Sequence, residues 1–267
     1  MRTPQEQFID SVNKFNLDNK YNFSDKILWE DEADCLMYNA EEEKKYINFA
    51  VWDNSLVDLR DDVCVFQCSV VKSLRKKNQF SLPYSFERFN KKFKTIKDKE
   101  KPSVGFCGNY IAHPHRKEAL FSLKLDKRLN TNFIWRLMFN GEFSKDDREL
   151  NREEYTENMQ ENAFIFCARG SGNFSIRFFE TLSCGRIPAL LDTDCLLPFD
   201  DVIDYSEFSV ISDTPEDLAN QILSKFNDGS YVEMQQKAYD IYQNYFHLDI
   251  VGKRIVEYLD RNYEKKL

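Results

Sequence analysis

The sequence lacks long apolar runs and has little histidine. No window approaches the ~20 apolar residues that a membrane-spanning helix needs, and the first residues have no apolar core of the kind found in a signal peptide. Histidine occurs three times in 267 residues, which is too few for a histidine-based metal cluster. These absences favour a soluble, folded protein without a membrane span.

The chain also has fewer basic than acidic residues. The chain has 37 Lys and Arg against 45 Asp and Glu, so its formal net charge is −8. A general nucleic-acid binder needs a cationic face, so we expect no nucleic-acid partner. Hydrophobic residues make up 42% and aromatic residues 15% of the chain, which argues against disorder.

The seven cysteines are odd in number and lie mostly in apolar runs. Cys64 and Cys68 lie four residues apart, but no second Cys/His pair follows at zinc-ligand spacing. Buried free thiols in a reducing compartment therefore explain the cysteines better than disulfides or a zinc site.

The first half of the chain reads as a small α/β unit followed by a connector. The first ~30 residues are polar and helix-like, and two β-type runs follow at 46–51 and 63–68. The basic stretch 88–101 ends at Pro102. We interpret it as a solvated connector between two lobes rather than a ligand-binding patch.

After Pro102 the pattern alternates between strands and helices. Strands are expected at 103–109, 132–137, 163–167, 187–191 and 208–211, and helices at 116–125, 152–160, 174–184, from Thr214 onward and over 231–265. Such alternation predicts a parallel sheet covered on both faces, as in a Rossmann-like fold.

The segment 166–180 is the best candidate for chemistry. A short apolar strand leads into a loop with Gly170 and Gly172, and this loop opens directly into a helix. Glycine lets backbone N–H groups approach an anion, and a helix start favours phosphate by roughly 0.3–2 kcal/mol. Arg169 and Arg177 flank the loop. The segment is neither a Walker P-loop nor a dinucleotide motif.

Glu180 lies three residues after Arg177, so the two side chains share a helix face. The spacing allows two interpretations. One is an ordinary intrahelical ion pair, and the other is a carboxylate that accepts hydrogen bonds from the ribose diol of a nucleotide.

The span 155–211 resembles the C-terminal part of the exostosin family, glycosyltransferase family 47. The matching segments are Phe166-Cys167, Arg169-Gly170, Ser175-Ile176-Arg177, Glu180-Thr181-Leu182, Gly185-Arg186-Ile187-Pro188, Leu197-Pro198-Phe199, Ile203-Asp204-Tyr205 and Phe208-Ser209-Val210. Upstream, Gly105-Phe106-Cys107-Gly108-Asn109 with Arg116 is similar to that family's first strand and glycine turn. Residues 1 to about 95 match only in architecture.

The resemblance implies an α/β fold of the GT-B type, with two Rossmann-like lobes and parallel sheets. Residues 1–95 would form a reduced acceptor-side lobe and residues 102–245 the lobe that binds the nucleotide-sugar. Residues 246–267 would form a C-terminal helix that can pack back across the lobes.

The implied activity is inverting transfer of a hexosyl or pentosyl group from a UDP-sugar to a glycan hydroxyl. By position, the expected donor-binding residues are Gly108, Asn109, Arg116, Arg169, Gly170, Ser171, Gly172, Ser175, Arg177 and Glu180. The three arginines would contact the diphosphate, and Glu180 would contact the ribose.

The catalytic base is expected at the tip of an N-terminal strand. Asp53 fits that position, and Asp34 and His113 are alternatives. Asp192-Thr193-Asp194 resembles a metal-binding Asp-x-Asp motif, but a polar strand exit is the preferred interpretation. We therefore expect no metal ligands and no required cofactor, although a divalent metal stays open.

Two departures from the family pattern matter. Animal and plant members usually carry a Golgi membrane anchor, which this chain lacks, and the N-terminal lobe is short. We expect a soluble, cytoplasmic member from a bacterium or a virus-infected host. The alternatives are a non-catalytic lobe that binds nucleotide-sugar or glycan for a partner enzyme, and a phosphate-binding α/β protein of unrelated activity. The sugar, the acceptor, the linkage and the oligomeric state stay open.

Overall fold

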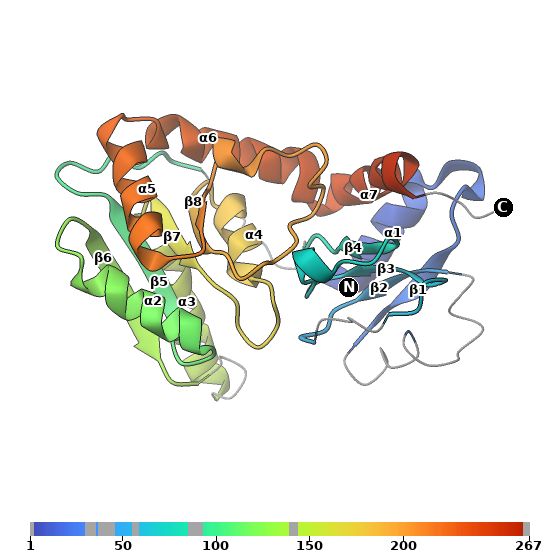
Figure 1. The fold of residues 1–267 in the computed structure, drawn as a ribbon, viewed down its shortest axis with the longest axis horizontal. Coiled ribbons are helices and arrows are strands. Elements are labelled where there is room, and N and C mark those ends of the chain that lie inside the picture. The colour runs from blue at the N-terminus through green and yellow to red at the C-terminus, as the bar shows by residue number, and fades with distance from the viewer. Residues whose placement is uncertain are drawn as a thin grey trace.

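The computed structural model describes residues 3–29, 36, 46–54, 59–84, 93–138 and 144–263. It has two lobes side by side, each built on one parallel sheet (Figure 1). The N-lobe contains α1 (Pro4–Phe15), β1 (Phe23–Leu28), β2 (Ile47–Ala50), β3 (Cys64–Gln67), a short 3₁₀ helix η4 (Lys72–Leu74) and β4 (Gln79–Ser81). The C-lobe contains β5 (Ser103–Asn109), α2 (Pro114–Leu125), β6 (Asn130–Arg136), α3 (Lys145–Glu161), β7 (Phe164–Cys167), α4 (Ile176–Ser183), β8 (Ile187–Leu191), β9 (Val210–Ser212), α5 (Pro215–Asn227) and α6 (Tyr231–Ile241). A π-helical turn, η7 (Tyr242–Phe246), leads to α7 (Leu248–Asn262).

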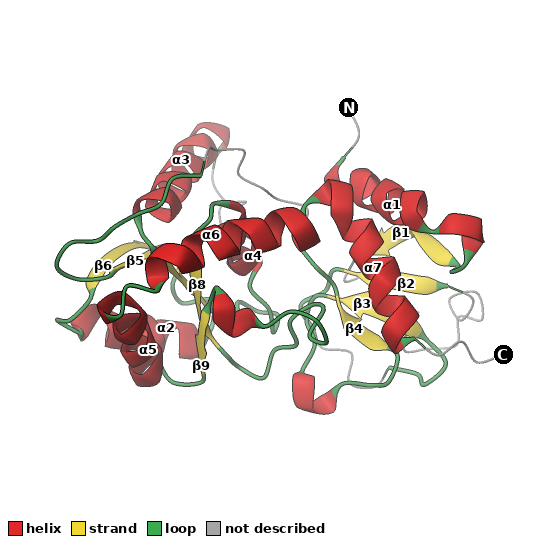
Figure 2. Cartoon of the chain, turned by 90° about the horizontal axis from the view of Figure 1, so that it is seen from above, coloured by secondary structure: helices red, strands yellow, loops and turns green. Residues whose placement is uncertain are grey.

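The C-lobe sheet has the order β6-β5-β7-β8-β9, with all neighbours parallel. Its central strands are apolar on both faces, as the fully buried β7 and β8 show. Helices α2 and α5 cover one face and α3 and α4 the other (Figure 2). Helices α2, α4 and α5 present apolar side chains to the sheet, whereas α3 buries the polar Thr156 and Asn158 beside Met159.

The N-lobe sheet has the order β1-β2-β3-β4, again all parallel. Helices α1 and α7 pack together over one face, where Phe8 of α1 meets Phe49 of β2 with ring centroids 5.2 Å apart. The last long helix of the chain therefore completes the lobe that the first residues begin. Two lobes with parallel sheets, the N-terminal one smaller, confirm the expected GT-B-like α/β class.

Two expectations for secondary structure were wrong. The first 30 residues are not uniformly helical, because residues 23–28 form β1, whose exposed Asp25 and Lys26 hide its strand character. The expected helix over 231–265 is broken at His247, which caps α7 after the π-helical turn. Strand β4 carries the polar residues Gln79 and Ser81, and the sequence analysis did not anticipate it.

The described part of the expected connector lies on the C-lobe. Ile96 exchanges two backbone–side-chain hydrogen bonds of 2.9 Å with Gln235 of α6. The guanidinium of Arg186 donates to the carbonyl of Lys94 at 3.0 Å. Residues 85–92, which hold much of the basic run, lie outside the described residues.

The two lobes are joined directly beside η4. Val71 and Cys195 form an antiparallel bridge between them. The Asp194 carboxylate accepts hydrogen bonds from the amide and the hydroxyl of Ser73. The loop after β8 is therefore fixed to the N-lobe.

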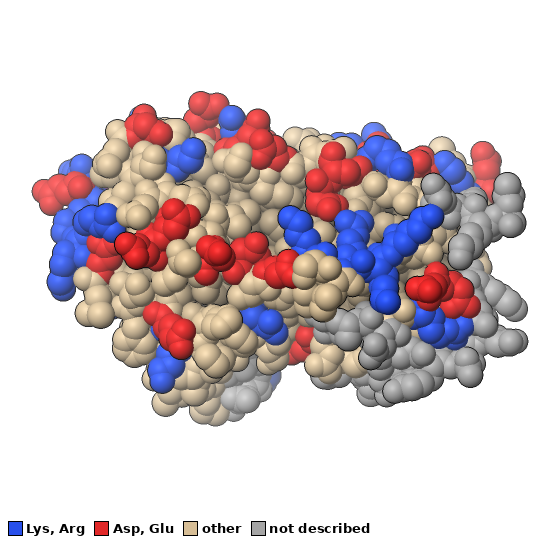
Figure 3. Space-filling view, in the orientation of Figure 1, with Lys and Arg blue, Asp and Glu red and all other residues tan. Residues whose placement is uncertain are grey.

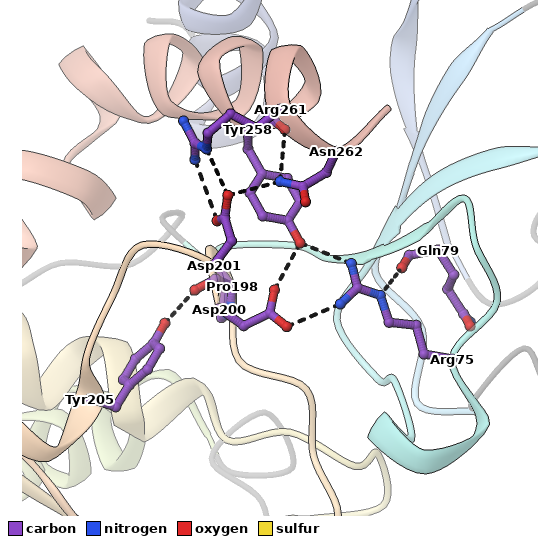
Figure 4. Close-up of polar contacts among 9 residues, drawn as sticks. All are labelled: Arg75, Gln79, Pro198, Asp200, Asp201, Tyr205, Tyr258, Arg261 and Asn262. Atoms are coloured by element: carbon purple, nitrogen blue, oxygen red, sulfur yellow. Dashed lines mark hydrogen bonds and ion pairs between the residues drawn. The ribbon is translucent and has the colours of Figure 1, made fainter. Parts of the chain in front are cut away.

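A polar network extends this junction to α7 (Figure 4). Arg75 forms an ion pair with Asp200 at 3.0 Å, and both contact the Tyr258 hydroxyl, at 2.9 and 2.8 Å. Next to it, Arg261 forms an ion pair with Asp201 at 2.6 Å. We call these five residues the hinge network, because they connect η4, the loop after β8 and α7.

The surface charge is mixed rather than uniformly acidic. On the face drawn in Figure 3, acidic and basic side chains alternate over the C-lobe, while basic ones gather over the N-lobe. Within the described ranges, no helix combines the length and apolarity needed to cross a bilayer.

Candidate functional site

The candidate site begins where β5 and β7 separate. These neighbours pair only through Val104–Phe164 and Gly105–Ile165, whereas β5 pairs with β6 along its whole length to Asn109. The strand order also reverses here, because β6 lies on one side of β5 and β7 on the other. Parallel α/β sheets bind ligands in the crevice at such a switch point.

Arg116, in the first turn of α2, bridges the two separated strands. Its guanidinium donates from Nη1 to the carbonyl of Asn109 at 3.0 Å and from Nη2 to the carbonyl of Ala168 at 2.7 Å. Its Nε is buried and has no acceptor. The side chain therefore places a cation across the mouth of the crevice.

The second arginine of the crevice, Arg177, comes from α4. Its Nη2 donates to the carbonyl of Cys107 at 2.8 Å. Its guanidinium lies 4.4 Å from the ring centroid of Phe106 and 5.5 Å from that of Tyr155, so two aromatic side chains hold it in position. Gly108 has φ +148°, and a Cβ there would lie 2.8 Å from Nη2, so this turn requires glycine.

Carboxylates act on two of these cations from a distance, Glu180 on Arg177 and Asp53 on Arg169, but none of the described residues forms an ion pair with them. Among the described residues, the ion pairs include none formed by Arg116, Arg169 or Arg177. Burial and the nearby charge of Arg177 lower the pKa of Arg116. Its cationic form is thus held at a cost that a bound anion would relieve.

The loop after β7 adds further donors. Arg169 folds over this loop and donates to the carbonyl of Ser171 at 2.7 Å. The amides of residues 170–172 have no acceptor in the part of the chain that the structure describes. Ser175 caps α4 without a side-chain hydrogen bond. Free amides and a helix start together favour an anion.

Asn173 fixes this loop against the N-lobe. Its amide donates to Ser69 Oγ at 2.8 Å, and its side-chain nitrogen donates to the carbonyl of Asp194 at 3.1 Å. Its Oδ1 accepts the Thr193 hydroxyl at 2.6 Å. The loop is therefore held between both lobes by a residue that is only 2% exposed.

Asp53 faces this loop from the N-lobe. It follows β2, and its Oδ1 lies 2.8 Å from the position of a Cβ built on Gly172. The Asp53 charge also acts on Arg169, whose pKa is lowered by burial and raised by this carboxylate, with a net downward shift. The candidate base thus lies across the gap between the lobes from the glycine loop.

Glu180 lies one turn deeper in α4 and is only 4% exposed. Its Oε2 accepts the Tyr155 hydroxyl, and its Oε1 lies 3.9 Å from Nη1 of Arg152. The partner within ion-pair distance is thus Arg152 of α3 rather than Arg177. The Glu180 carboxylate is therefore engaged by side chains of α3.

The alternatives for the base lie in different places. His113 caps α2 at the carboxyl end of β5, on the C-lobe side of the crevice. Asp34 lies outside the described residues.

The Asp192-Thr193-Asp194 motif is engaged with protein partners. Asp192 accepts the amide of Cys195 at 3.0 Å, and Asp194 binds Ser73. The described ranges contain no group of three or more side chains suited to a metal ion.

A small pocket between the lobes borders the start of α4. Its lining is mostly apolar and comes from both lobes: Cys68, Ser81, Leu82, Phe174, Ser175, Phe178, Phe179, Leu190, Cys195, Leu196, Leu197 and Pro198. The open space at the start of α4 therefore lies beside Phe174 and Ser175, between the two lobes.

Sequence reasoning did not identify Tyr155 or Asn173 as parts of the site. Tyr155 comes from α3, and only its contacts with Arg177 and Glu180 reveal its place. Asn173 lies in the loop that the sequence analysis identified, directly after Gly172. Its amide side chain, which can bond to several backbone groups, is the sequence feature that could have identified it.

Known proteins resemble this chain over the segments that form the site. The model of the Exostosin GT47 domain matches residues 52–225, which begin just after β2 and include β5, α2, β7 and α4. An Exostosin-1 homolog of Caenorhabditis elegans is 22% identical over 161 residues, covering 60% of this chain and 41% of that protein. Exostosin-1 of Mus musculus is 26% identical over 166 residues, covering 58% of this chain and 22% of that protein. The match thus spans less than half the length of these relatives.

Solved structures of TarM also resemble the chain. One, of TarM itself, has a TM-score of 0.49 and 14% identity, covering 93% of this chain and 57% of that chain. The other, an S. aureus TarM mutant in complex with Fondaparinux, alpha-GlcNAc-glycerol and UDP, has a TM-score of 0.47 and 15% identity, covering 96% and 58%.

Proposed function

Because the chain belongs to the exostosin GT47 family, we propose that it is a glycosyltransferase. It transfers a hexosyl or pentosyl group from a UDP-sugar to a glycan hydroxyl, with inversion at the anomeric carbon. The observation that carries the proposal is the crevice between β5 and β7, where Arg116 and Arg177 donate to backbone carbonyls and form no direct ion pair with a carboxylate of the described residues.

The leaving group explains why such a crevice suits this reaction. In a single displacement the acceptor oxygen attacks the anomeric carbon while the bond to the nucleoside diphosphate breaks, through an oxocarbenium-like state. Negative charge then accumulates on the diphosphate. Arg116, Arg169, Arg177 and the amides of residues 170–172 stabilise it, and fixed donors of this kind are worth about 10²–10³ each in rate. The scheme needs no metal and no cofactor.

Asp53 is the proposed base. It would accept the proton of the acceptor hydroxyl as that oxygen attacks, and its position opposite Gly172 sets it across the gap from the donor loop. Replacing it with Asn keeps the shape and removes the base. We expect kcat to fall by about 10²–10⁴ while the affinity for UDP stays within about twofold.

The remaining donor contacts follow the shape of the crevice. Gly108 and Asn109 form its β5 wall, Gly170, Ser171 and Gly172 form its floor, and Ser175 begins α4 beside it. Glu180 would bind the ribose through Oε1, the oxygen that faces Arg152. Because Arg152 is 44% exposed at its side chain, it can move aside when a nucleoside enters.

The test is a panel of UDP-sugars incubated with the protein, with release of UDP as the readout. We expect UDP release from at least one donor, and an increase in melting temperature with UDP that Arg177→Ala abolishes. Stabilisation by UDP without release from any donor would favour a non-catalytic nucleotide-sugar-binding protein. Indifference to every nucleoside diphosphate would contradict both functions.

A further inference from the structure

His113 stands at the edge of the crevice and has no role in the scheme above. It follows β5 and is the N-cap residue of α2. Its Nδ1 accepts the amide of His115 at 3.3 Å. In a neutral imidazole one nitrogen accepts and the other carries the hydrogen. The hydrogen of His113 therefore sits on Nε2, which is left as a donor.

The two permanent charges that act on this imidazole are both positive. Arg116 acts on it from α2 and Arg169 from the loop after β7. Burial lowers the pKa of His113, and Arg169, His115 and Arg116 lower it further. The ring is therefore neutral near pH 7 in the protein without ligand. A neutral ring whose Nδ1 is already engaged makes a poor base.

We propose that His113 is a donor-binding residue whose Nε2–H donates a hydrogen bond to a non-bridging oxygen of the diphosphate, a role that rests on the proposed function. Arg116 and Arg169, the two arginines near the ring, would draw the diphosphate to its side. Once bound, the negative charge of the diphosphate offsets those cations and favours the imidazolium. The added proton goes on Nδ1, which then no longer accepts the amide of His115. Binding at about pH 6 is then coupled to proton uptake by His113.

His113→Asn separates this role from helix capping. Asparagine is a good N-cap residue, and its side-chain oxygen replaces Nδ1 as the acceptor for the amide of His115. It has no group that reaches the place of Nε2. We expect the melting temperature without ligand to stay within about 2 °C of the wild type, and the dissociation constant of UDP to rise about tenfold.

The measurement is calorimetric titration with UDP at about pH 6 in two buffers of different ionisation enthalpy. The terminal phosphate of UDP itself titrates near this pH, so the relevant quantity is the difference in protons taken up between wild type and variant. We expect the wild type to take up more protons than His113→Asn, and the tenfold difference in affinity to shrink as the pH rises to about 8.

His115→Asn is the matched control, because this histidine lies two residues further along the same turn and is exposed. It should keep the affinity of the wild type for UDP, because His115 is not placed against the diphosphate. If His113→Asn binds UDP as the wild type does, with equal proton uptake, the inference is overturned while the proposed function stands. If the wild type itself binds no UDP, the proposed function fails first. His113→Gln, which keeps a donor of similar reach but does not titrate, should bind UDP at about pH 8 and show no extra proton uptake.

Discussion

Two groups of arginines, one at the junction of the lobes and one in the C-lobe crevice, differ in their partners. In the hinge network, Arg75 and Arg261 each meet an aspartate, at 3.0 and 2.6 Å. In the crevice, Arg116 and Arg177 donate to backbone carbonyls and form no ion pair with any described residue, although Glu180 acts on Arg177 from a distance. A paired arginine joins elements of the fold. An arginine without a counter-ion at the end of a parallel sheet attracts an anion from outside.

Arg186 shows that the missing counter-ion alone is not sufficient. It too donates only to carbonyls, those of Gln160, Lys94 and Gly185. However, it is only 4% exposed, and it lies at the opposite end of β8 from the crevice loops. Its hydrogen bonds hold the chain before β5 against the C-lobe. Access from the crevice is thus the second property that separates binding arginines from structural ones.

The largest effect is expected from replacing Arg177, one of the two crevice arginines. Arg177→Ala removes one fixed cation from the crevice, so we expect the transfer rate to fall by about 10²–10³ and UDP to bind at least about tenfold more weakly. Arg177→Met, which refills the space between Phe106 and Tyr155, should show the same loss. UDP titration and steady-state kinetics measure both.

Arg261→Ala is the matched control in the hinge network. It should leave the affinity for UDP unchanged and lower the free energy of unfolding by no more than about 1 kcal/mol, since its ion pair is partly exposed. Equal loss of UDP affinity in the two variants would remove the distinction between the two groups of arginines.

The next largest effects are expected from alanine substitutions at two glycines, Gly108 and Gly252. At Gly108 a Cβ would press on Nη2 of Arg177, so Gly108→Ala should lower stability by about 1–3 kcal/mol and also weaken UDP binding. At Gly252 of α7 a Cβ would lie 2.1 Å from the carbonyl oxygen of Ser11 in α1. Gly252→Ala should therefore cost about 3 kcal/mol of stability.

The distinguishing readout for this pair is the affinity of the folded fraction for UDP, measured beside chemical unfolding. Gly252→Ala should keep the affinity of the folded protein for UDP, whereas Gly108→Ala should reduce that affinity. A Gly108→Ala variant with normal affinity would mean that the position of Arg177 does not matter for the anion.

The smallest expected effect is on the free energy of unfolding at acid pH. Burial raises the pKa of Asp201, but hydrogen bonds from Arg261 and Asn262 lower it, and the net shift is downward. A carboxylate with a depressed pKa stabilises the fold above its unfolded value, about 3.9, and loses that contribution as the pH falls through the folded value. Between about pH 5 and pH 3 the free energy of unfolding should fall more in the wild type than in Arg261→Gln. We expect the difference to be less than about 1 kcal/mol. Parallel acid curves for the two proteins would argue against this pair as a stabilising contact.

The sequence predicted the C-lobe better than the N-lobe for a physical reason. Strands such as Phe164–Cys167 are buried on both faces, so their apolar runs are unambiguous. The edge strand β1 exposes Asp25 and Lys26, and β4 is only three residues long, so neither gives a clear pattern. The family match from Trp52 onward also extends into the N-lobe, where sequence reasoning found only a likeness in architecture.

For the candidate site, local chemistry was predictable and long-range contacts were not. The glycine loop and its flanking arginines are contiguous in sequence, so their suitability for an anion can be recognised there. The bond from Asn173 to Ser69 and the stacking of Tyr155 on Arg177 join segments that only the fold brings together. Whether Asp53 and His113 act as proposed stays a prediction.

The packing of α7 on α1 has a consequence for how the chain folds during synthesis. The sheet of the N-lobe receives that cover only when residues 248–262 have left the ribosome, after the whole C-lobe has been made. The lobe translated first is therefore the one completed last. Removing this final helix would uncover Phe66 and Phe80, whose rings contact Tyr258 of α7, and would leave the second core of the later-made lobe, around β5 and α2, with all its members in place.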